Sequence, residues 1–353
     1  MTLKNRRSYL DMLRIIACFL VIFNHLRGYS AYQQTTDSIH AFYYMGYTMF
    51  TRINVPIFFM ISGSLLLSKD IGYKELLCKR TVRIVMALVC ASMVAYLVNI
   101  RHVISSFDLV DFLRNLFNGK HVNAYWYLYA YIGFLLMVPM FRRIAKQLCR
   151  ADFLLLLAVH FFFFTLLPLG NYVLKRFGIS EVAISGDLSF PLVGTKALFY
   201  PLIGYYIDQV FDISKLNRKN VWILPVIILV GIVISSGFTY HQGIHYQYTQ
   251  GFVQTFDYTT AIAVFLLVKY LFVNVKPIRN CSILHRIVAF VGSLTFGIYL
   301  IDPVLKVFSN RFNAVVTTQD PILYSIIWCV FSMMVGGFTT YLLKKIPVVK
   351  TLL

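Results

Sequence analysis

Two ionisable residues, Arg14 and His25, lie in the first stretch of the chain that is long and apolar enough to cross a membrane, residues 9–30. A helix rises about 1.5 Å and turns about 100° per residue, so both residues fall on nearly the same face, about 16 Å apart along the axis. An ionisable side chain at membrane depth is costly and usually faces a protein interior or a water-filled cavity. The pair therefore indicates a polar seam that leads into the membrane.

His25 is the residue of this pair that can do acid–base or nucleophilic chemistry. An imidazole ordinarily titrates near pH 6.5, so it can accept a proton from an attacking hydroxyl, and such catalysis contributes about 100- to 10,000-fold. It can also carry an acyl group as an acyl-imidazole. The sequence leaves both roles open, beside that of a buried histidine bonded to a neighbouring helix. Asp11 precedes Arg14 by one helical turn and can orient its guanidinium, or pair with it for structural reasons alone.

The elements that position these residues are membrane helices. Of the 353 residues, 59% are hydrophobic and 13% charged, and the mean hydropathy is +0.70. Only helices and closed barrels satisfy the backbone in a bilayer, and the apolar runs here have the helical length of about 20 residues. We expect an all-α, polytopic membrane protein with about ten transmembrane helices. The predicted spans are residues 9–30, 41–67, 82–100, 124–141, 153–170, 188–208, 220–238, 252–273, 287–308 and 321–343.

Basic residues set the predicted orientation, because cytoplasmic loops carry the excess of Lys and Arg. With the N-terminus inside, the cytoplasmic segments hold Lys4, Arg6, Arg7, Lys69, Lys74, Lys79, Arg80, Arg142, Arg143, Lys146, Arg150, Lys215, Arg218, Lys219, Lys276, Arg279, Arg286, Lys344, Lys345 and Lys350. The other side holds fewer, among them Arg101, Arg114, Lys120, Lys175, Arg176 and Arg311. We therefore expect both termini in the cytoplasm. The same bias accounts for most of the net charge of +19, so we expect the lipid bilayer, and no nucleic acid, as a partner.

Residues 1–353 are expected to form one membrane domain. No polar stretch is long enough for a separate soluble domain. The six cysteines have no paired spacing, which argues against disulfides and a structural metal site. His241 and His245 have helical zinc spacing, but the sequence offers no third ligand, so we expect no metal. The first span is too long for a cleaved signal peptide, and we expect the protein to stay in the inner (plasma) membrane.

Four segments, in order along the chain, resemble a known family. The first has an Arg and a His separated by ten residues, and it resembles the first-helix signature of the acyltransferase-3 family of membrane O-acyltransferases. The pair Arg80 and Arg83 falls where that family has an Arg-x-x-Arg motif. The resemblance implies ten helices and transfer of an acyl group from acyl-CoA to a hydroxyl, usually on a glycan or cell-surface molecule. The four segments are residues 9–17 with His25, 54–63, 126–129 and 293–301.

The residues expected to bind acyl-CoA are arginines near the inner face: Arg80, Arg83 and Arg14. Acyl-CoA is polyanionic and cytoplasmic, and a bidentate guanidinium suits its phosphates better than the point charge of a lysine. The pantetheine arm could then run along the first helix toward His25. For Arg80 and Arg83, the alternative is plain membrane anchoring by the positive-inside bias.

The residues expected to contact the acceptor are polar or aromatic: Ser62, Trp126, Tyr299 and Asp302. Aromatic faces with polar donors suit sugar rings, and residues 239–248 have the same character. The alternative is an aromatic belt at the membrane interface. Ser62 can bond to a ligand or simply pack helices. Asp302 stands where family members commonly have a histidine, so the resemblance implies a different acceptor or subfamily, unless Asp302 is an ordinary interfacial residue.

These patterns together predict a bacterial-type membrane O-acetyltransferase. It would move an acetyl or other short acyl group from cytoplasmic acetyl-CoA to a hydroxyl of a carbohydrate or cell-surface glycan, with His25 at the reactive centre. The alternative is a transporter or flippase of a glycan or lipid-linked precursor, because polar residues in a helical bundle also mark substrate pathways. A transporter would need neither the Arg and His on one face nor an Arg pair at the inner mouth. Binding of acetyl-CoA separates the two classes.

Overall fold

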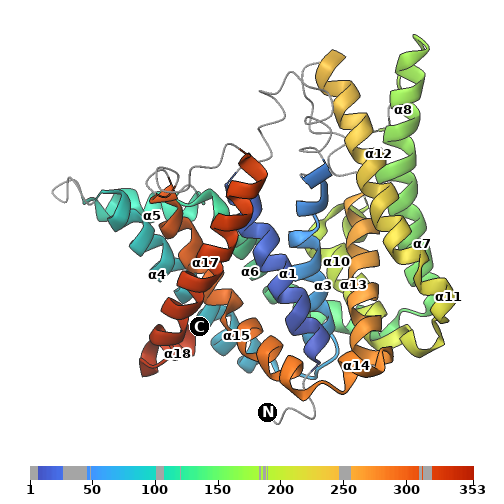
Figure 1. The fold of residues 1–353 in the computed structure, drawn as a ribbon. Helices are drawn as coiled ribbons and strands as arrows, with labels where there is room; N and C mark the ends of the chain where they lie inside the picture. Colours follow the sequence, from blue (N-terminus) through green and yellow to red (C-terminus); the bar gives the residue numbers. More distant parts are fainter. Residues whose placement is uncertain are drawn as a thin grey trace. The chain divides into compact units, whose positions relative to one another are not determined.

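The structure is a computed structural model whose regular elements are all helices. It describes residues 7–26, 46–47, 49–100, 107–119, 121–182, 184–185, 188, 190–245, 256–309, 312 and 320–353, without the side chains of residues 239–245 and 321. Within these residues no strand occurs (Figure 1). Nine helical segments of this part are long and apolar enough to cross a membrane. The protein is therefore an all-helical, multi-pass membrane protein, as predicted.

The chain divides into two compact units, each assembled from separate stretches of sequence. The first unit comprises Met1–Gly28, Asp70–Pro139 and Ser282–Leu353, and the second comprises Tyr29–Lys69 and Met140–Cys281. Each unit thus brings together helices that are far apart in the chain. That residues 1–353 form one membrane domain stays a prediction.

The first unit contains the helix that carries Arg14 and His25. Its helices are α1 (Ser8–His25), α4 (Val82–Asn99) with a π-helical turn before it (Glu75–Thr81), α5 (Leu109–Phe117), a 3-10 turn (Asn123–Tyr125) that leads into α6 (Trp126–Gln147), α15 (Ser282–Lys306), α17 (Pro321–Leu343) and α18 (Pro347–Leu352). Of α6, the part up to Pro139 belongs to this unit, and the rest belongs to the second unit. Helix α1 packs on α15 and α17, and α15 packs also on α17 and α4 (Figure 1). Helix α15 is therefore the central contact of α1.

Small residues allow α15 to pack closely on both neighbours. A Cβ atom added to Gly292 would lie 2.8 Å from the Cβ of Asp11 on α1. One added to Gly297 would overlap the side chain of Thr340 on α17. In a membrane, such residues let helix backbones approach where no hydrophobic driving force brings the helices together. The two glycines therefore fix how α1 and α17 lie against α15.

Helix α17 begins with a strong cap. The carboxylate of Asp320 accepts hydrogen bonds from the backbone N–H groups of Ile322 and Leu323, at 2.8 and 3.3 Å. Pro321 takes the first helical position, where the backbone needs no N–H group. The cap satisfies donors that the start of a helix leaves unpaired.

The second unit contains the remaining helices. They are α3 (Asn54–Leu66), α7 (Arg150–Phe161), a π-helical turn (Phe162–Leu166) that leads into α8 (Leu167–Arg176), α9 (Pro191–Gly194), α10 (Lys196–Tyr205) with a π-helical turn after it (Tyr206–Val210), a 3-10 turn (Ile213–Lys215), α11 (Arg218–Val221), α12 (Ile223–His245), α13 (Asp257–Asn274) and α14 (Lys276–Arg279). In its core, α3 and α10 approach so closely that a Cβ atom on Gly63 would overlap the backbone of Pro201. The hydroxyl of Ser64 also donates to the carbonyl of Gly204, at 2.9 Å.

The predicted span over residues 188–208 differs from the structure. Helix α9 ends at Gly194, and Thr195 is extended, with φ −99° and ψ 111°. The helix that follows, with its π-helical turn, runs from Lys196 to Val210. At about 1.5 Å per residue it is about 22 Å long, short of the hydrocarbon core of about 30 Å. This is why the described part shows nine membrane-length segments rather than ten.

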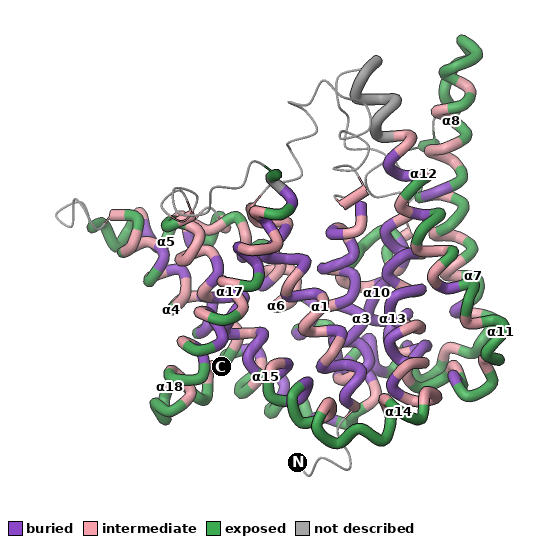
Figure 2. The backbone as a smooth tube through the Cα atoms, in the orientation of Figure 1, coloured by how far each residue is buried: buried purple, intermediate pink, exposed green. Residues whose placement is uncertain are grey.

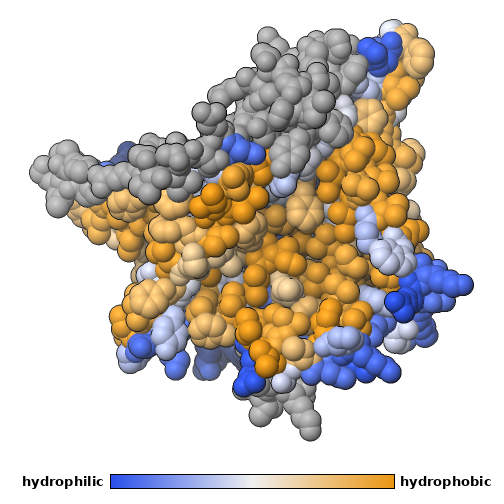
Figure 3. All heavy atoms as spheres, viewed as in Figure 1, coloured by the Kyte–Doolittle hydropathy of each residue, from blue (hydrophilic) through white to orange (hydrophobic). Residues whose placement is uncertain are grey.

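Burial differs sharply between helices, as expected for a protein with lipid around it. Helices α1 and α3 are mostly buried, whereas α7 and α8 are largely exposed (Figure 2). The exposed side chains of such helices are apolar, for example Leu154, Leu155 and Phe162 on the α7–α8 segment. Residues of this kind cover much of the face drawn in Figure 3. Exposed apolar helix faces are the surface that a bilayer would contact.

Candidate active site

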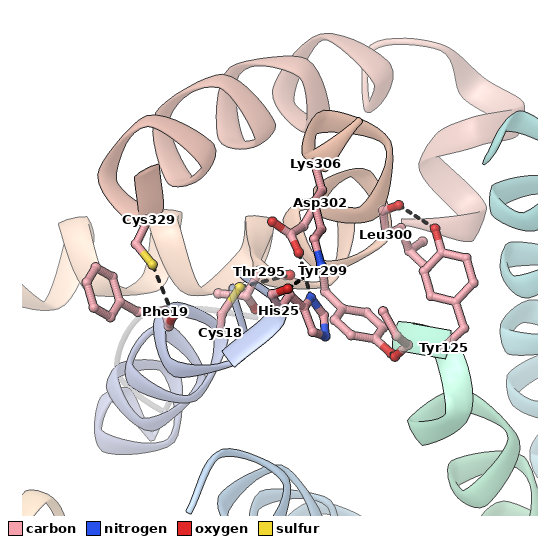
Figure 4. Close-up of polar contacts among 11 residues, drawn as sticks. Cys18, Phe19, His25, Tyr125, Thr295, Tyr299, Leu300, Asp302, Lys306 and Cys329 are labelled. Carbon is pink, nitrogen blue, oxygen red and sulfur yellow. Dashed lines mark hydrogen bonds and ion pairs between the residues drawn. The ribbon is translucent and has the colours of Figure 1, made fainter. Parts of the chain in front are cut away.

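His25 is the last residue of α1, and it meets a carboxylate of α15 there. Its Nδ1 lies 2.6 Å from Oδ2 of Asp302 (Figure 4). The imidazole side chain is 16% exposed and the carboxylate side chain 1%. Asp302 is thus almost closed off from solvent, and its Oδ1 has no hydrogen-bond partner among the described residues. The ring of His25 is the hydrogen-bond partner of the other oxygen, Oδ2, of this buried carboxylate.

The contact with Asp302 assigns the hydrogen on the His25 ring. A carboxylate accepts hydrogen bonds, so Nδ1 carries the hydrogen and donates to Oδ2. In the neutral ring, Nε2 then keeps its lone pair and can accept a proton. A carboxylate that fixes the tautomer of a histidine in this way also stabilises the imidazolium that forms when Nε2 is protonated. The pair is therefore suited to general-base chemistry at Nε2.

Lys306 ties the end of α1 to the same part of α15. Its Nζ donates to the backbone carbonyl of His25 (Figure 4), one of the carbonyls that a helix leaves unpaired at its C-terminus. A cation there also interacts favourably with the helix dipole. Lys306 follows Asp302 by one turn of α15, so one short stretch of α15 holds both the main chain and the side chain of His25. The sequence signal for Lys306 was weak: a basic residue at the end of an apolar span.

Two tyrosines beside His25 link the start of α6 to α15 by hydrogen bonds. The hydroxyl of Tyr299 donates to the carbonyl of Ala124, and the hydroxyl of Tyr125 donates to the carbonyl of Leu300, each at 2.6 Å. The centres of the two tyrosine rings are 6.0 Å apart, and the ring of Tyr299 lies 6.5 Å from that of His25 (Figure 4). Tyr299, predicted to contact the acceptor, thus uses its hydroxyl hydrogen on the backbone. Tyr125 was not among the predicted site residues.

The predicted ion pair at the other end of α1 is present. Nη1 of Arg14 donates to Oδ1 of Asp11 at 2.5 Å, and the two side chains are 29% and 2% exposed. Asp11 also lies where α1 packs on Gly292. Arg14 and His25 are about 16 Å apart along the helix, so α1 takes part in two separate polar contacts. The structure brings Arg14 to Asp11 and His25 to Asp302.

Arg80 and Arg83 each have a partner in the first unit. Nη2 of Arg80 lies 3.2 Å from Oε1 of Glu75, and the two side chains are 38% and 50% exposed. Nε of Arg83 donates to the carbonyl of Leu352 at 3.0 Å. A guanidinium has five N–H donors, so one such bond leaves others for a phosphate. The predicted role of the pair in acyl-CoA binding stays a prediction.

The other predicted acceptor residues lie in different surroundings. Trp126 begins α6, directly after Tyr125, and is 51% exposed. Ser62 lies on α3 in the second unit, where its hydroxyl donates to the carbonyl of Phe58 one turn earlier, at 2.8 Å. This bond within one helix is the structural alternative to ligand binding for Ser62. The side chains of residues 239–248, including His241 and His245, lie outside the described residues.

No group of three or more His, Cys, Asp and Glu side chains that could hold a metal ion occurs in the described part of the chain. The histidine at the candidate site instead pairs with a single carboxylate. That the protein needs no metal stays a prediction.

The fold and the site together define a class: multi-pass helical membrane proteins with a histidine paired to a buried carboxylate at the end of the first helix. The family model of the acyltransferase-3 family, described as an acyltransferase domain, matches residues 7–341. The chain belongs to this family, and the resemblance found in the sequence is confirmed. Membership supports acyltransferase activity in a membrane. Neither the curated proteins nor the solved structures contain a match to the chain.

Proposed function

We propose that this protein is an acyl-CoA-dependent O-acetyltransferase of the plasma membrane. It moves an acetyl or other short acyl group from cytoplasmic acyl-CoA to a hydroxyl of a carbohydrate or cell-surface glycan. The observation that carries the proposal is the contact of 2.6 Å between Nδ1 of His25 and Oδ2 of Asp302. It supplies the oriented base that a hydroxyl needs before it can attack a thioester. Membership of an acyltransferase family supports the reaction class.

The proposed reaction uses Nε2 of His25 as a proton carrier. The acceptor hydroxyl attacks the thioester carbonyl while Nε2 takes its proton, and the negative charge of Asp302 stabilises the imidazolium. When the tetrahedral intermediate collapses, the C–S bond breaks and Nε2 returns the proton to the departing sulfur. The products are an acyl ester and CoA with a free thiol. An acyl-imidazole formed at the same Nε2 is the alternative that the sequence left open.

The donor is held, in this proposal, by guanidinium groups at the cytoplasmic side. Arg80, Arg83 and Arg14 contact the nucleotide phosphates, and the bias of basic residues toward one side supports this orientation. At the acceptor end, the exposed indole of Trp126 offers a face for a sugar ring. Asp302, predicted to contact the acceptor, is proposed instead to orient His25, because its carboxylate is buried against the ring.

The test measures donor binding and transfer separately. Calorimetry gives the Kd of acetyl-CoA for the purified protein in detergent, and membrane vesicles given radiolabelled acetyl-CoA show whether label reaches glycan. We expect His25→Ala to bind acetyl-CoA like the wild type and to transfer none. Arg80→Ala with Arg83→Ala should weaken binding. Full transfer by His25→Ala would overturn the role of His25, and a folded wild type that binds no acetyl-CoA would favour the transporter.

A further inference from the structure

A series of aromatic rings leads away from His25 within the first unit. The ring of His25 lies 6.5 Å from that of Tyr299, which lies 6.3 Å from that of Tyr127 in an edge-on arrangement. The ring of Tyr127 stacks on that of Tyr131 with centres 5.8 Å apart and planes at 15°. Tyr127 and Tyr131 are one turn apart on α6, so they share a helix face. We call these two residues and Tyr299 the tyrosine series.

The far end of the tyrosine series lies near a predicted phosphate ligand. Tyr131 and Arg83 are close enough for their side chains to interact electrostatically. The series therefore runs from His25 toward one of the two arginines expected to hold acyl-CoA. Its three ring-to-ring steps limit the distance from His25 to Tyr131 to about 19 Å. A pantetheine arm is comparable to about five residues of extended chain, or about 17 Å.

The exposure of the series fits a path along α6. Tyr299 is buried at the histidine end, whereas Tyr127 and Tyr131 are half-buried. Tyr129, between them in sequence, instead points to α5, where its hydroxyl donates to the carbonyl of Leu116 at 2.5 Å. The tyrosines of α6 thus divide into those of the series and one that fixes α5. Tyr129 offers a matched control on the same helix.

Tyrosine rings suit the chemistry of a pantetheine arm at membrane depth. The arm carries two amides between apolar methyl and methylene groups, and an amide moved out of water without a hydrogen bond costs free energy. A tyrosine offers an apolar ring face together with a hydroxyl that can bond an amide. The anionic nucleotide is too costly to bury there. It would stay with the arginines while the arm follows the rings.

We propose that Tyr127 and Tyr131 line the path by which the pantetheine arm of acyl-CoA reaches His25. This inference rests on the proposed function, because it assumes acyl-CoA as the donor. It adds that the donor is recognised at two places, the nucleotide by arginines and the arm by rings. Binding of the two halves of the donor is then separable by mutation.

The test compares two probes by calorimetry on the full chain in detergent: acetyl-CoA, and adenosine 3′,5′-bisphosphate, which lacks the arm. The double variant Tyr127→Leu/Tyr131→Leu should raise the Kd of acetyl-CoA about tenfold or more and leave that of the bisphosphate unchanged. Arg83→Ala should weaken both probes. The control Tyr129→Leu should leave both Kd values within about twofold. If the double Leu variant does not fold, Tyr127→Phe/Tyr131→Phe keeps the rings and should still raise the acetyl-CoA Kd about fivefold.

Two results would overturn the inference alone: an unchanged Kd for acetyl-CoA in the folded tyrosine variants, or an equal loss for both probes. A wild-type protein that binds neither probe would overturn the donor assignment of the proposed function, and this inference with it. The two failures are therefore distinguishable in one set of titrations.

Discussion

One carboxylate decides which nitrogen of His25 is able to take a proton. Asp302 accepts from Nδ1 at 2.6 Å, and an amide at position 302 could donate to Nδ1 instead, which would move the hydrogen to Nε2. We expect Asp302→Asn to lower acetyl transfer by about 10³- to 10⁴-fold, as the wrong tautomer does in other histidine–carboxylate enzymes. Acetyl-CoA binding, measured by calorimetry, should not change, because the proposed role of Asp302 is to orient His25 and not to hold the nucleotide phosphates.

Asp320→Asn is the matched control for that change. Asp320 caps α17 through backbone N–H groups, and asparagine caps a helix as well as aspartate does. This variant removes the same charge elsewhere in the first unit and should keep transfer within about twofold. If Asp302→Asn transferred acetyl at the wild-type rate, the tautomer would not matter and the contact would be structural.

Lys306 acts on His25 through the backbone rather than through the reaction. Its Nζ donates to the carbonyl of His25, so removing the charge should let the last turn of α1 shift against α15. We expect Lys306→Met to lower kcat by about a hundredfold, since a displacement of about 1 Å is enough for that loss. The Kd of acetyl-CoA should stay the same, and Lys306→Arg should recover most of kcat. Equal activity of the Met and Arg variants would exclude this positioning role.

His25 could be found from the sequence, but its partner could not. An ionisable residue in an apolar helix is visible without a structure, and the spacing to Arg14 placed both on one face. The pairing with Asp302 joins residues 277 positions apart and depends on how α1 packs on α15. The ring contact between Tyr299 and Tyr127 likewise depends on how two helices far apart in the sequence, α15 and α6, lie together. Contacts between distant helices therefore had to come from the fold.

Because α1 packs closely on α15 at Gly292, even a methyl side chain at this position is predicted to have a large effect on stability. A Cβ atom on Gly292 would lie 2.8 Å from the Cβ of Asp11, so Gly292→Ala must push the two helices apart. Overpacking of this kind costs about 1–3 kcal/mol, and we expect a lower Tm in detergent together with reduced transfer. Gly133 of α6 has no heavy atom within 4 Å of an added Cβ, so Gly133→Ala should not lower the Tm. Equal effects of the two changes on the Tm would mean that α1 and α15 are not tightly packed against each other at Gly292.

Hydropathy predicted most helices but not the break in residues 188–208. Hydropathy averaged over about 20 residues does not reveal that a single residue is extended. The run also contains enough apolar side chains to resemble a span. The local cause is the extended Thr195 between two short helices. Prolines at 191 and 201 were the available signals, because proline favours a helix start and removes a backbone donor inside a helix.

The residues proposed for chemistry gather in one of the two units. Asp11, Arg14, His25 and Asp302 lie in the first unit with both arginines of the Arg-x-x-Arg pair, whereas Ser62 lies in the second. The first unit is assembled from three separate stretches of the chain. Its site therefore exists only when the N-terminal and C-terminal helices are packed together, which explains why no single segment of sequence contains it.

The orientation predicted for the whole molecule rests on its charge distribution and can be tested on its own cysteines. Cys78, Cys149 and Cys281 are free and exposed, and each lies in a segment rich in Lys or Arg that is predicted to face the cytoplasm. A membrane-impermeant maleimide should leave all three unlabelled in intact cells and label them in inverted vesicles. Ser309→Cys, beyond the end of α15 that is predicted to face outward, should show the opposite pattern. Labelling of Cys78 and Cys281 from outside intact cells would reverse the topology and place Arg80 and Arg83 away from cytoplasmic acyl-CoA.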